Sequence, residues 1–277
     1  RGLKFAKSVY AMAKIGDEFQ LVQFKLSGCA LSWFDFVEAS GGINALVLHN
    51  NTSTASDFTV SGSGALSVNA GAILFTLSPF ATPASASSTR LSGFTGIALD
   101  GTGTLGATEY VITVQNPTST AISPKLTAII SSPLTTSANL TKSGRGTLVL
   151  TATNVAGGGA TKQTTINEGI LRLSTLGNIG GTTGNIVFAG GILQLADGFA
   201  ETDLSTRTLL FMNAGGTLDV GTNNLTFAGP IGGLAGASVG GFTKAGSANL
   251  VLGGTARREK SYFYTAIQYN KRRDINS

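Results

Sequence analysis

The feature that most constrains this chain is a long succession of short segments in which apolar and polar residues alternate, between about residues 40 and 254. Examples are "ALSVNAG", "GTLVLTA" and "NIVFAGG", and most segments end at Gly, Asn, Asp or Ser. Strict alternation over so few residues is typical of a half-buried strand. The sequence therefore predicts an all-β fold built from many short strands.

The connections between these segments indicate how the strands are joined. Two-residue hairpin loops favour Asn-Gly and Asp-Gly, yet Asn-Gly is absent from the chain and Asp-Gly occurs only at Asp100–Gly101 and Asp197–Gly198. Single Gly and polar corners predominate, and Gly tolerates positive φ at sharp corners. This favours a parallel β-helix, a solenoid whose coils (rungs) stack on their neighbours. At roughly 22 residues a rung it would have about nine or ten rungs. A β-sandwich or barrel is the alternative.

The charge distribution argues against a nucleic-acid-binding protein. The 277 residues carry a net charge of +5, but the excess lies at the two ends. Residues 1–26 contribute +3 and residues 257–277 contribute +4, whereas residues 27–256 carry −2. A phosphate-binding surface needs Lys and Arg clustered on the folded body. We therefore expect no nucleic-acid partner, and the absence of a long apolar run predicts no transmembrane helix.

The chain divides into three zones that differ in residue pattern, glycine content and charge. Residues 1–39 place apolar side chains at intervals of three or four, from Phe5 to Leu26, which predicts a short helical N-terminal cap or a leader. Residues 40–256 form the predicted β-helix. Residues 257–277, "RREKSYFYTAIQYNKRRDINS", contain no Gly and form a basic tail, for which binding to RNA or anionic lipid is the alternative to a solvated terminus.

One phrase occurs twice inside the β-helical zone. "LTKSGRGTLVLTATN" begins at Leu140 and "FTKAGSANLVLGGTA" begins at Phe242. Both contain Thr-Lys-x-Gly followed, after three residues, by Leu-Val-Leu. We interpret the phrase as the entry strand of a rung, with Thr and Lys facing outward and Gly forming the corner. The leucines then fill the core, and the lysines protect strand edges.

At these residues the chain resembles the autotransporter-associated β-strand repeat, also called the passenger-associated transport repeat. The first copy spans about residues 140–174 and departs from the family pattern at Val155–Ala156 and in a longer corner, "GGGATK". The second copy, about 242–256, has Ala248 and Asn249 where Gly-Thr is usual and lacks the second half of the pattern. The matching positions are Leu140, Thr141, Lys142, Gly144, Gly146, Leu148, Leu150, Asn154, Thr164, Ile166, Gly169, Leu171, Leu173, Phe242, Thr243, Lys244, Gly246, Leu250 and Leu252.

The resemblance implies a right-handed parallel β-helix in a secreted or surface-displayed bacterial passenger region that aids its own export across the outer membrane. It also implies an outer-membrane translocator in the full-length protein. The C-terminal residues show no succession of amphipathic strands of about ten residues with aromatic girdles. We therefore expect a passenger fragment without the translocator, with host or environmental glycans or proteins as partners.

Candidate catalytic and ligand-binding residues are sparse. His49 is the single histidine and Cys29 the single cysteine, so neither a multi-His metal site nor an intrachain disulfide is expected. No nucleophile motif lies near His49, which excludes the usual serine triad. "GGGATK", Gly157–Lys162, lacks the Gly-Lys-Ser/Thr of a phosphate-binding loop. We therefore predict no enzymatic activity, no cofactor and no metal.

The densest acidic cluster is the alternative candidate site. Asp197, Glu201 and Asp203 lie in "ADGFAETDLSTR", close to Arg207. Clustered carboxylates on a β-helix suit a polysaccharide lyase or hydrolase, or a weak calcium or glycan site. A solvated corner is the simpler interpretation. The sequence thus favours a structural or adhesive surface protein, with a carbohydrate-active β-helix or glycan-binding module as the alternative.

Overall fold

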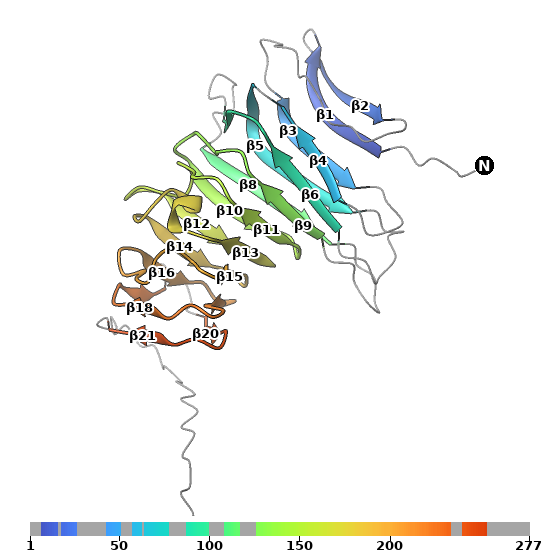
Figure 1. The fold of residues 1–277 in the computed structure, drawn as a ribbon. Helices are drawn as coiled ribbons and strands as arrows, with labels where there is room; N and C mark the ends of the chain where they lie inside the picture. The colour runs from blue at the N-terminus through green and yellow to red at the C-terminus, as the bar shows by residue number, and fades with distance from the viewer. Residues whose placement is uncertain are drawn as a thin grey trace, which may run out of the picture.

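The computed structural model describes residues 7–15, 18–26, 43–50, 57–62, 64–77, 87–99, 108–116, 126–233 and 240–253. Within these residues the chain winds repeatedly around a common interior, so that short strands stack into two long sheets (Figure 1). The first sheet contains β1 (Lys7–Ile15), β2 (Glu18–Leu26), β3 (Ile43–Asn50), β5 (Ala65–Leu77), β7 (Gly96–Ala98), β8 (Glu109–Gln115), β10 (Asn139–Ser143), β12 (Gln163–Ile166), β14 (Asn185–Phe188), β16 (Thr208–Phe211) and β19 (Ile231–Gly232).

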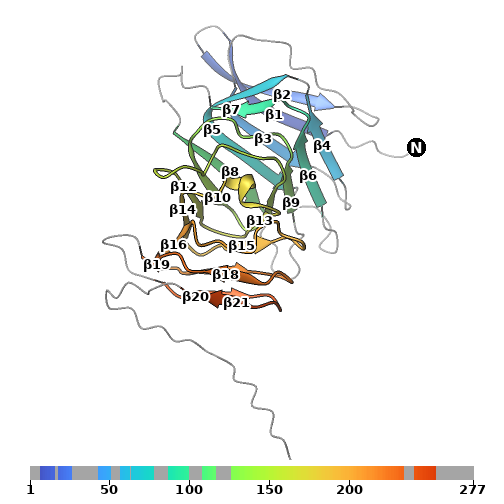
Figure 2. The same ribbon diagram turned by 60° about the vertical axis from the view of Figure 1, so that its left-hand side comes forward.

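The second sheet alternates with the first along the chain. Its strands are β4 (Asp57–Ser61), β6 (Ser87–Ser92), β9 (Leu126–Ile130), β11 (Thr147–Leu150), β13 (Ile170–Leu173), β15 (Ile192–Leu195), β17 (Gly216–Asp219) and β20 (Phe242–Ala245). A third, less regular side holds the 3-10 helix η1 (Leu176–Ile179) and the pair β18 (Leu225–Phe227) and β21 (Leu250–Leu252). Seen partly along its axis, the stack closes around its interior (Figure 2).

The pairing of successive rungs is parallel. Leu140 of β10 lies beside Tyr110 of the preceding rung and Thr164 of the following one. Thr147 of β11 lies likewise between Thr127 and Ile170. Parallel strands need long crossover connections, which here pass through the other sides of the coil. The predicted all-β parallel β-helix is therefore confirmed, and the strands that the structure describes form neither a sandwich nor a barrel of hairpins. Its handedness stays a prediction.

Rung length differs along the chain. Gln163 donates its backbone N–H to the side chain of Asn139, 24 residues earlier, close to the predicted period. Nearer the N-terminus Ser88 pairs with Asp57 across 31 residues, and Arg90 reaches Ser131 across 41. Among the described residues the second sheet has eight strands, fewer than the nine or ten rungs expected, in agreement with these longer early rungs.

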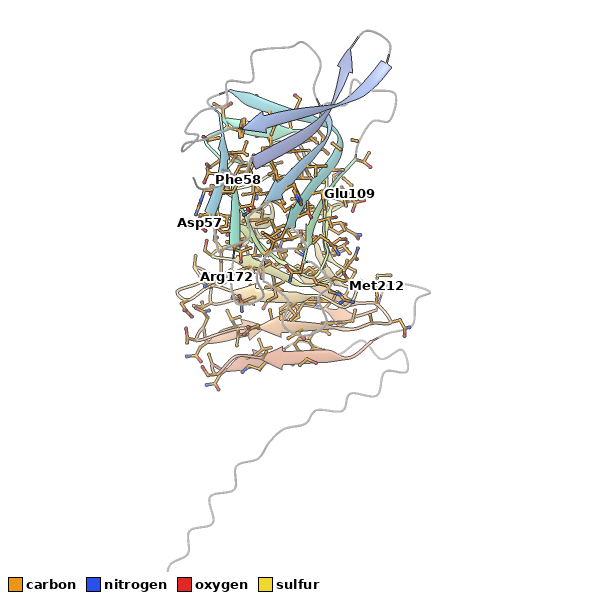
Figure 3. The ribbon with its side chains drawn as sticks, turned by 90° about the vertical axis from the view of Figure 1, so that its right-hand side faces the viewer. Asp57, Phe58, Glu109, Arg172 and Met212 are labelled. Atoms are coloured by element: carbon orange, nitrogen blue, oxygen red, sulfur yellow. The ribbon has the colours of Figure 1, made fainter. Side chains whose placement is uncertain are left out.

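The core consists of columns of inward side chains, one from each rung. The column that we call the first column runs along the first sheet and contains Leu46, Ile73, Ile112, Lys142, Ile166, Phe188 and Phe211. The second column runs along the second sheet and contains Phe58, Thr89, Ala128, Leu148, Leu171, Leu193, Leu218 and Lys244. Figure 3 shows side chains both inside the stack and on its outer surface, where Asp57 is exposed beside the buried Phe58. Burial of such columns, at about 25 cal/mol per Å² of apolar surface, is the main force that joins the rungs.

The predicted helical N-terminal cap is wrong. Residues 7–15 and 18–26 form the antiparallel strands β1 and β2, and β1 pairs antiparallel with β3 at the edge of the first sheet. The sequence between them, Gly16-Asp17, is of a type that favours two-residue hairpin loops. An isolated amphipathic helix would leave its apolar side and the edge of β3 uncovered, whereas a strand at these residues pairs with β3. The boundary at residue 39 stays a prediction, and the tail 257–277 lies outside the described residues.

Candidate functional site

The lysine of the first Thr-Lys-x-Gly phrase points into the core, which corrects the outward orientation expected from the sequence. Lys142 lies in β10 with 0% of its surface exposed, in register with Ile112 and Ile166 of the first column. Side chains two apart in a strand share a face, so Lys142 lies on the same face as the fully buried Leu140. The neighbouring Thr141 is on the opposite face, where its hydroxyl donates to the carboxylate of Glu109.

Three backbone carbonyls surround the side-chain nitrogen of Lys142. The distances are 2.7 Å to the oxygen of Ser143, 2.5 Å to that of Gly144 and 3.0 Å to that of Glu168. Ser143 ends β10 and Gly144 begins the corner between β10 and β11, whereas Glu168 belongs to the corresponding corner of the next rung. A lysine ammonium has three donors, so it matches this arrangement. The side chain thus joins two successive corners from inside.

Burial lowers the pKa of Lys142 from its ordinary value of 10.5 to about 7, and the carboxylate of Glu168 opposes this shift. Removal of the charged form from water is the larger effect. The nitrogen is therefore close to its titration midpoint at neutral pH, although it stays enclosed by acceptors. This is a structural lysine, since its side chain is fully buried and its nitrogen donates to three backbone oxygens.

The corner that Lys142 spans requires glycine. Gly144 has φ +74° and Gly169, in the next rung, has φ +64°. A Cβ on Gly169 would overlap the carbonyl oxygens of Gly144 and Gly146. The corners of successive rungs therefore stack with their backbones in contact.

The second Thr-Lys-x-Gly phrase lies on a different side of the solenoid from the first. Phe242, Thr243 and Lys244 belong to β20 in the second sheet, and Lys244 is in register with Leu218 of the second column. Its nitrogen donates to the carbonyl oxygen of Gly246 at 2.7 Å, just as Lys142 donates to Gly144. The same strand-and-corner sequence therefore occurs in both sheets, and the two copies do not occupy equivalent positions of two rungs.

The remaining repeat positions are structural. Leu148 and Leu150 of β11 are fully buried, as predicted. Asn154 forms a bridge between rungs, because its amide oxygen accepts from the backbone of Leu134 at 2.8 Å and its nitrogen donates to the carbonyl of Asn178 at 2.6 Å. Buried positions in the next rung are Thr164, Ile166, Leu171 and Leu173. In the second copy Leu250 and Leu252 lie in β21, paired with Leu225 and Phe227 of β18.

The acidic cluster is divided among separate backbone and hydroxyl partners. Glu201 accepts from the backbone N–H of Leu176 at 3.0 Å and from the hydroxyl of Thr175 at 2.6 Å, at the start of η1. Asp203 accepts from the backbone and hydroxyl of Ser205, which lowers the pKa of its carboxyl. Asp197 accepts from the hydroxyl of Thr222 at 3.0 Å. Among the described residues no group of three or more His, Cys, Asp or Glu is placed to hold a metal ion.

Arg207, which the sequence places only as a neighbour of the acidic cluster, has a structural role that the sequence does not indicate. It is fully buried and donates to the backbone oxygens of Gly157 at 3.3 Å, Ile179 at 2.8 Å and Gly181. Burial lowers its pKa to about 10, opposed by Glu201, so the guanidinium remains charged at neutral pH. The Arg207 side chain therefore links its own rung to the two preceding rungs, through Gly157 in one and through Ile179 and Gly181 in the other. No local sequence signal marks it, because its acceptors are backbone atoms up to 50 residues away.

The other candidate positions are ordinary parts of the coil. The "GGGATK" corner packs closely on the following rung, since a Cβ on Gly158 would overlap Gly180. His49 lies in β3 beside Thr76, and partial burial lowers the pKa of its imidazole. Cys29 lies outside the described residues.

Comparison with known proteins shows a partial similarity to an autotransporter adhesin. No family model matches the chain, and no solved structure matches it. The adhesin BmaC autotransporter of Brucella suis biovar 1 (strain 1330) is 39% identical over 106 residues. That segment covers 38% of this chain and only 3% of the length of the adhesin. The chain is therefore related in part to an autotransporter adhesin.

This relationship agrees with the expectation from the Thr-Lys-x-Gly phrase at the coarse level of an autotransporter protein. The repeat family itself stays a resemblance. Among the helices that the structure describes, none has the length and apolar character needed to cross a bilayer.

Proposed function

We propose that this chain is a β-helical passenger segment of a bacterial surface protein, with a structural and adhesive role. It extends an adhesive surface away from the cell and supports its own export across the outer membrane, where a translocator would be its partner. Surface glycans or proteins of a host or of the environment are the expected binding partners. We further propose that it has no enzymatic activity.

The observation that carries this proposal is the 39% identity over 106 residues with an autotransporter adhesin. The parallel stack supports it in physical terms. Each rung buries its columns against the preceding rung, so a stack of this kind can lengthen by one rung at a time. Folding that proceeds outside the cell would then bias the movement of the chain outward.

A carbohydrate-active enzyme is the less favoured function. Polysaccharide-cleaving sites need carboxylates that converge on a substrate, whereas Asp197, Glu201 and Asp203 each have separate structural partners. Arg207, their neighbour in sequence, is buried among backbone oxygens. The contacts of these four residues therefore argue for a structural segment.

Display on a cell surface tests the proposal. The chain is placed between a signal peptide and an outer-membrane translocator in a Gram-negative host. Protease sensitivity of the chain on intact cells then measures export, and retention of the cells on glycan-coated and protein-coated surfaces measures adhesion. Gly158→Ala, which creates backbone overlap, is compared with Gly64→Ala, which meets no atom within 4 Å.

We expect surface exposure and retention for the parent chain and Gly64→Ala, with reduced export for Gly158→Ala. Export without retention on any coated surface would contradict the adhesive role and leave the export role standing. Release of sugar from pectin or alginate by the purified chain, lost in Asp203→Ala, would overturn the non-enzymatic proposal.

A further inference from the structure

The outer surface of the second sheet carries a straight column of four residues, Arg90, Ile129, Val149 and Arg172, which we call the arginine column. They lie in register on β6, β9, β11 and β13, one residue from each strand. Each of the four lies between two buried neighbours in its own strand, so all four side chains are on the outer face. Figure 1 shows these strands side by side along the stack.

The arginine column concentrates positive charge on a chain that is otherwise sparse in charge. Its four strands contain two arginines and no Asp or Glu. The positions of Arg90 and Arg172 are three strand spacings apart, which is about 14 Å. Arg172 is exposed, and Arg90 is partly exposed and donates to the hydroxyl of Ser131 at 2.9 Å. A ligand that pairs with both guanidinium groups must therefore carry at least two separated negative charges.

The interval between the two arginines is apolar. Ile129 and Val149 are partly exposed there, and Thr127 and Thr147 lie beside them in the neighbouring outward column. Branched apolar side chains next to hydroxyl groups suit an uncharged sugar, which has C–H faces and hydroxyls of its own. A carboxylate above Ile129 or Val149 would instead lose water without gaining a partner. The ligand should therefore be uncharged between its two negative groups.

A polysaccharide fits this pattern better than a peptide or a second copy of the chain. β11 pairs with β9 on one side and with β13 on the other, so its backbone groups are used within the sheet. A peptide laid across these strands would leave its own backbone N–H and C=O groups without partners, whereas sugar hydroxyls can bond the threonines. A second copy in a symmetric contact would present the same acid-free strands.

We propose that the arginine column binds a linear polysaccharide in which carboxylated sugars alternate with uncharged sugars. Each guanidinium pairs with one carboxylate through the two parallel hydrogen bonds that arginine favours. The uncharged sugar between them packs on Ile129 and Val149, and the polymer runs along the axis of the solenoid, across the strands. This inference names a ligand class for the proposed adhesive role and rests on it.

Binding of the purified full chain to soluble polymers at neutral pH, measured by titration calorimetry, tests this proposal. The probe is hyaluronate, in which glucuronate alternates with an uncharged N-acetylated sugar. Polygalacturonate carries a carboxylate on every sugar, dextran carries none, and poly-glutamate represents an acidic peptide. The variants are Arg90→Gln, Arg172→Gln and Val149→Glu. Arg145→Gln is the matched control, because Arg145 is exposed at the corner before β11 and lies outside the column.

We expect hyaluronate to bind most tightly and dextran not to bind. Arg90→Gln and Arg172→Gln should each weaken the binding of hyaluronate by about fivefold, as for one exposed charge pair, whereas Arg145→Gln should change it by less than about twofold. Val149→Glu should weaken binding further, because it places a negative charge between the two carboxylates. Thermal unfolding of each variant identifies those that remain folded.

An equal loss in Arg145→Gln, or binding of polygalacturonate or poly-glutamate as tight as that of hyaluronate, would overturn the proposal. So would a dimer of the free chain that shields Arg172 from an arginine-specific reagent. The proposed adhesive role is tested separately by retention of displayed cells. Retention on protein-coated surfaces without any binding of hyaluronate would reject this ligand and leave the adhesive role standing.

Discussion

The side-chain nitrogen of Lys142 lies 3.0 Å from the backbone oxygen of Glu168, 26 residues further along the chain and one rung further along the stack. The same nitrogen also bonds the corner that directly follows its own strand. A side chain that looked like a surface residue in the sequence thus holds two successive corners from the interior. This arrangement leads to the first two predictions.

Replacement of Lys142 by methionine should destabilise the chain. Methionine fits the apolar column between Ile112 and Ile166 but leaves the carbonyls of the two corners without a donor. We expect a loss of about 1–3 kcal/mol in the free energy of unfolding, measured by denaturant titration near pH 10, where the cost of burying the charge is small. Lys244→Met is the matched control, and because Lys244 is exposed its effect should stay within about 0.5 kcal/mol. Equal effects of the two substitutions would contradict the assigned burial.

The stability of the chain should rise with pH above neutrality through Lys142. Its pKa is about 7 in the folded chain and about 10.5 when unfolded, so between these pH values the unfolded chain binds more protons. Stability then increases with pH by up to about 1.4 kcal/mol per unit, and below about pH 7 this contribution no longer changes. The difference in unfolding free energy between the parent and Lys142→Met isolates it. A difference that is constant from pH 7 to 10 would refute the lowered pKa.

Removal of the Arg207 side chain should loosen the third side of the solenoid. Arg207→Ala leaves the backbone oxygens of Gly157, Ile179 and Gly181 without this donor. We expect a loss of about 2–4 kcal/mol, because several hydrogen bonds from a charged group disappear together. Amide exchange should accelerate around residues 157 and 181. Arg172→Ala, at an exposed position of β13, is the control and should leave exchange there unchanged.

A methyl group at Gly158 should be poorly tolerated. Its Cβ would overlap the backbone of Gly180 in the next rung, which cannot move without shifting the stack. We expect Gly158→Ala to cost about 2 kcal/mol or more, whereas Gly64→Ala, with free space around it, should be within about 0.5 kcal/mol of the parent. Thermal unfolding of the two variants side by side provides the measurement. Indistinguishable transitions would mean that the two rungs are not in contact at this corner.

Much of the fold follows from local patterns in the sequence. Alternation in "GTLVL" correctly predicts that Leu148 and Leu150 face the core. The same rule, applied to Leu140 and Lys142, would have placed the lysine inside, since residues two apart share a face. The charge of Lys142 favours an outward orientation, whereas its position in the strand places it inside. The carbonyls that make burial of the charge tolerable come partly from another rung, so they cannot be read from the phrase itself.

The remaining differences between the predicted and the observed structure arise from contacts between residues that are distant in the sequence. Apolar spacing at residues 7–26 suits a helix as well as a strand, and pairing of β1 with the edge of β3 decides between them. The two Thr-Lys-x-Gly phrases match in sequence, yet the lengths of the intervening corners place β10 and β20 in different sheets. Arg207 is fixed by backbone acceptors that no sequence pattern marks.

Amine labelling of the unmodified chain tests the central claim most directly, namely that the Thr-Lys-x-Gly lysine is a buried connection between rungs wherever a rung follows it. The native protein is acylated at pH 8 and the modified fraction at each lysine is determined by mass spectrometry. We expect Lys244 to react at the rate of an exposed amine, while Lys142 reacts only after denaturant is added. Equal labelling of Lys142 and Lys244 in the native chain would contradict it.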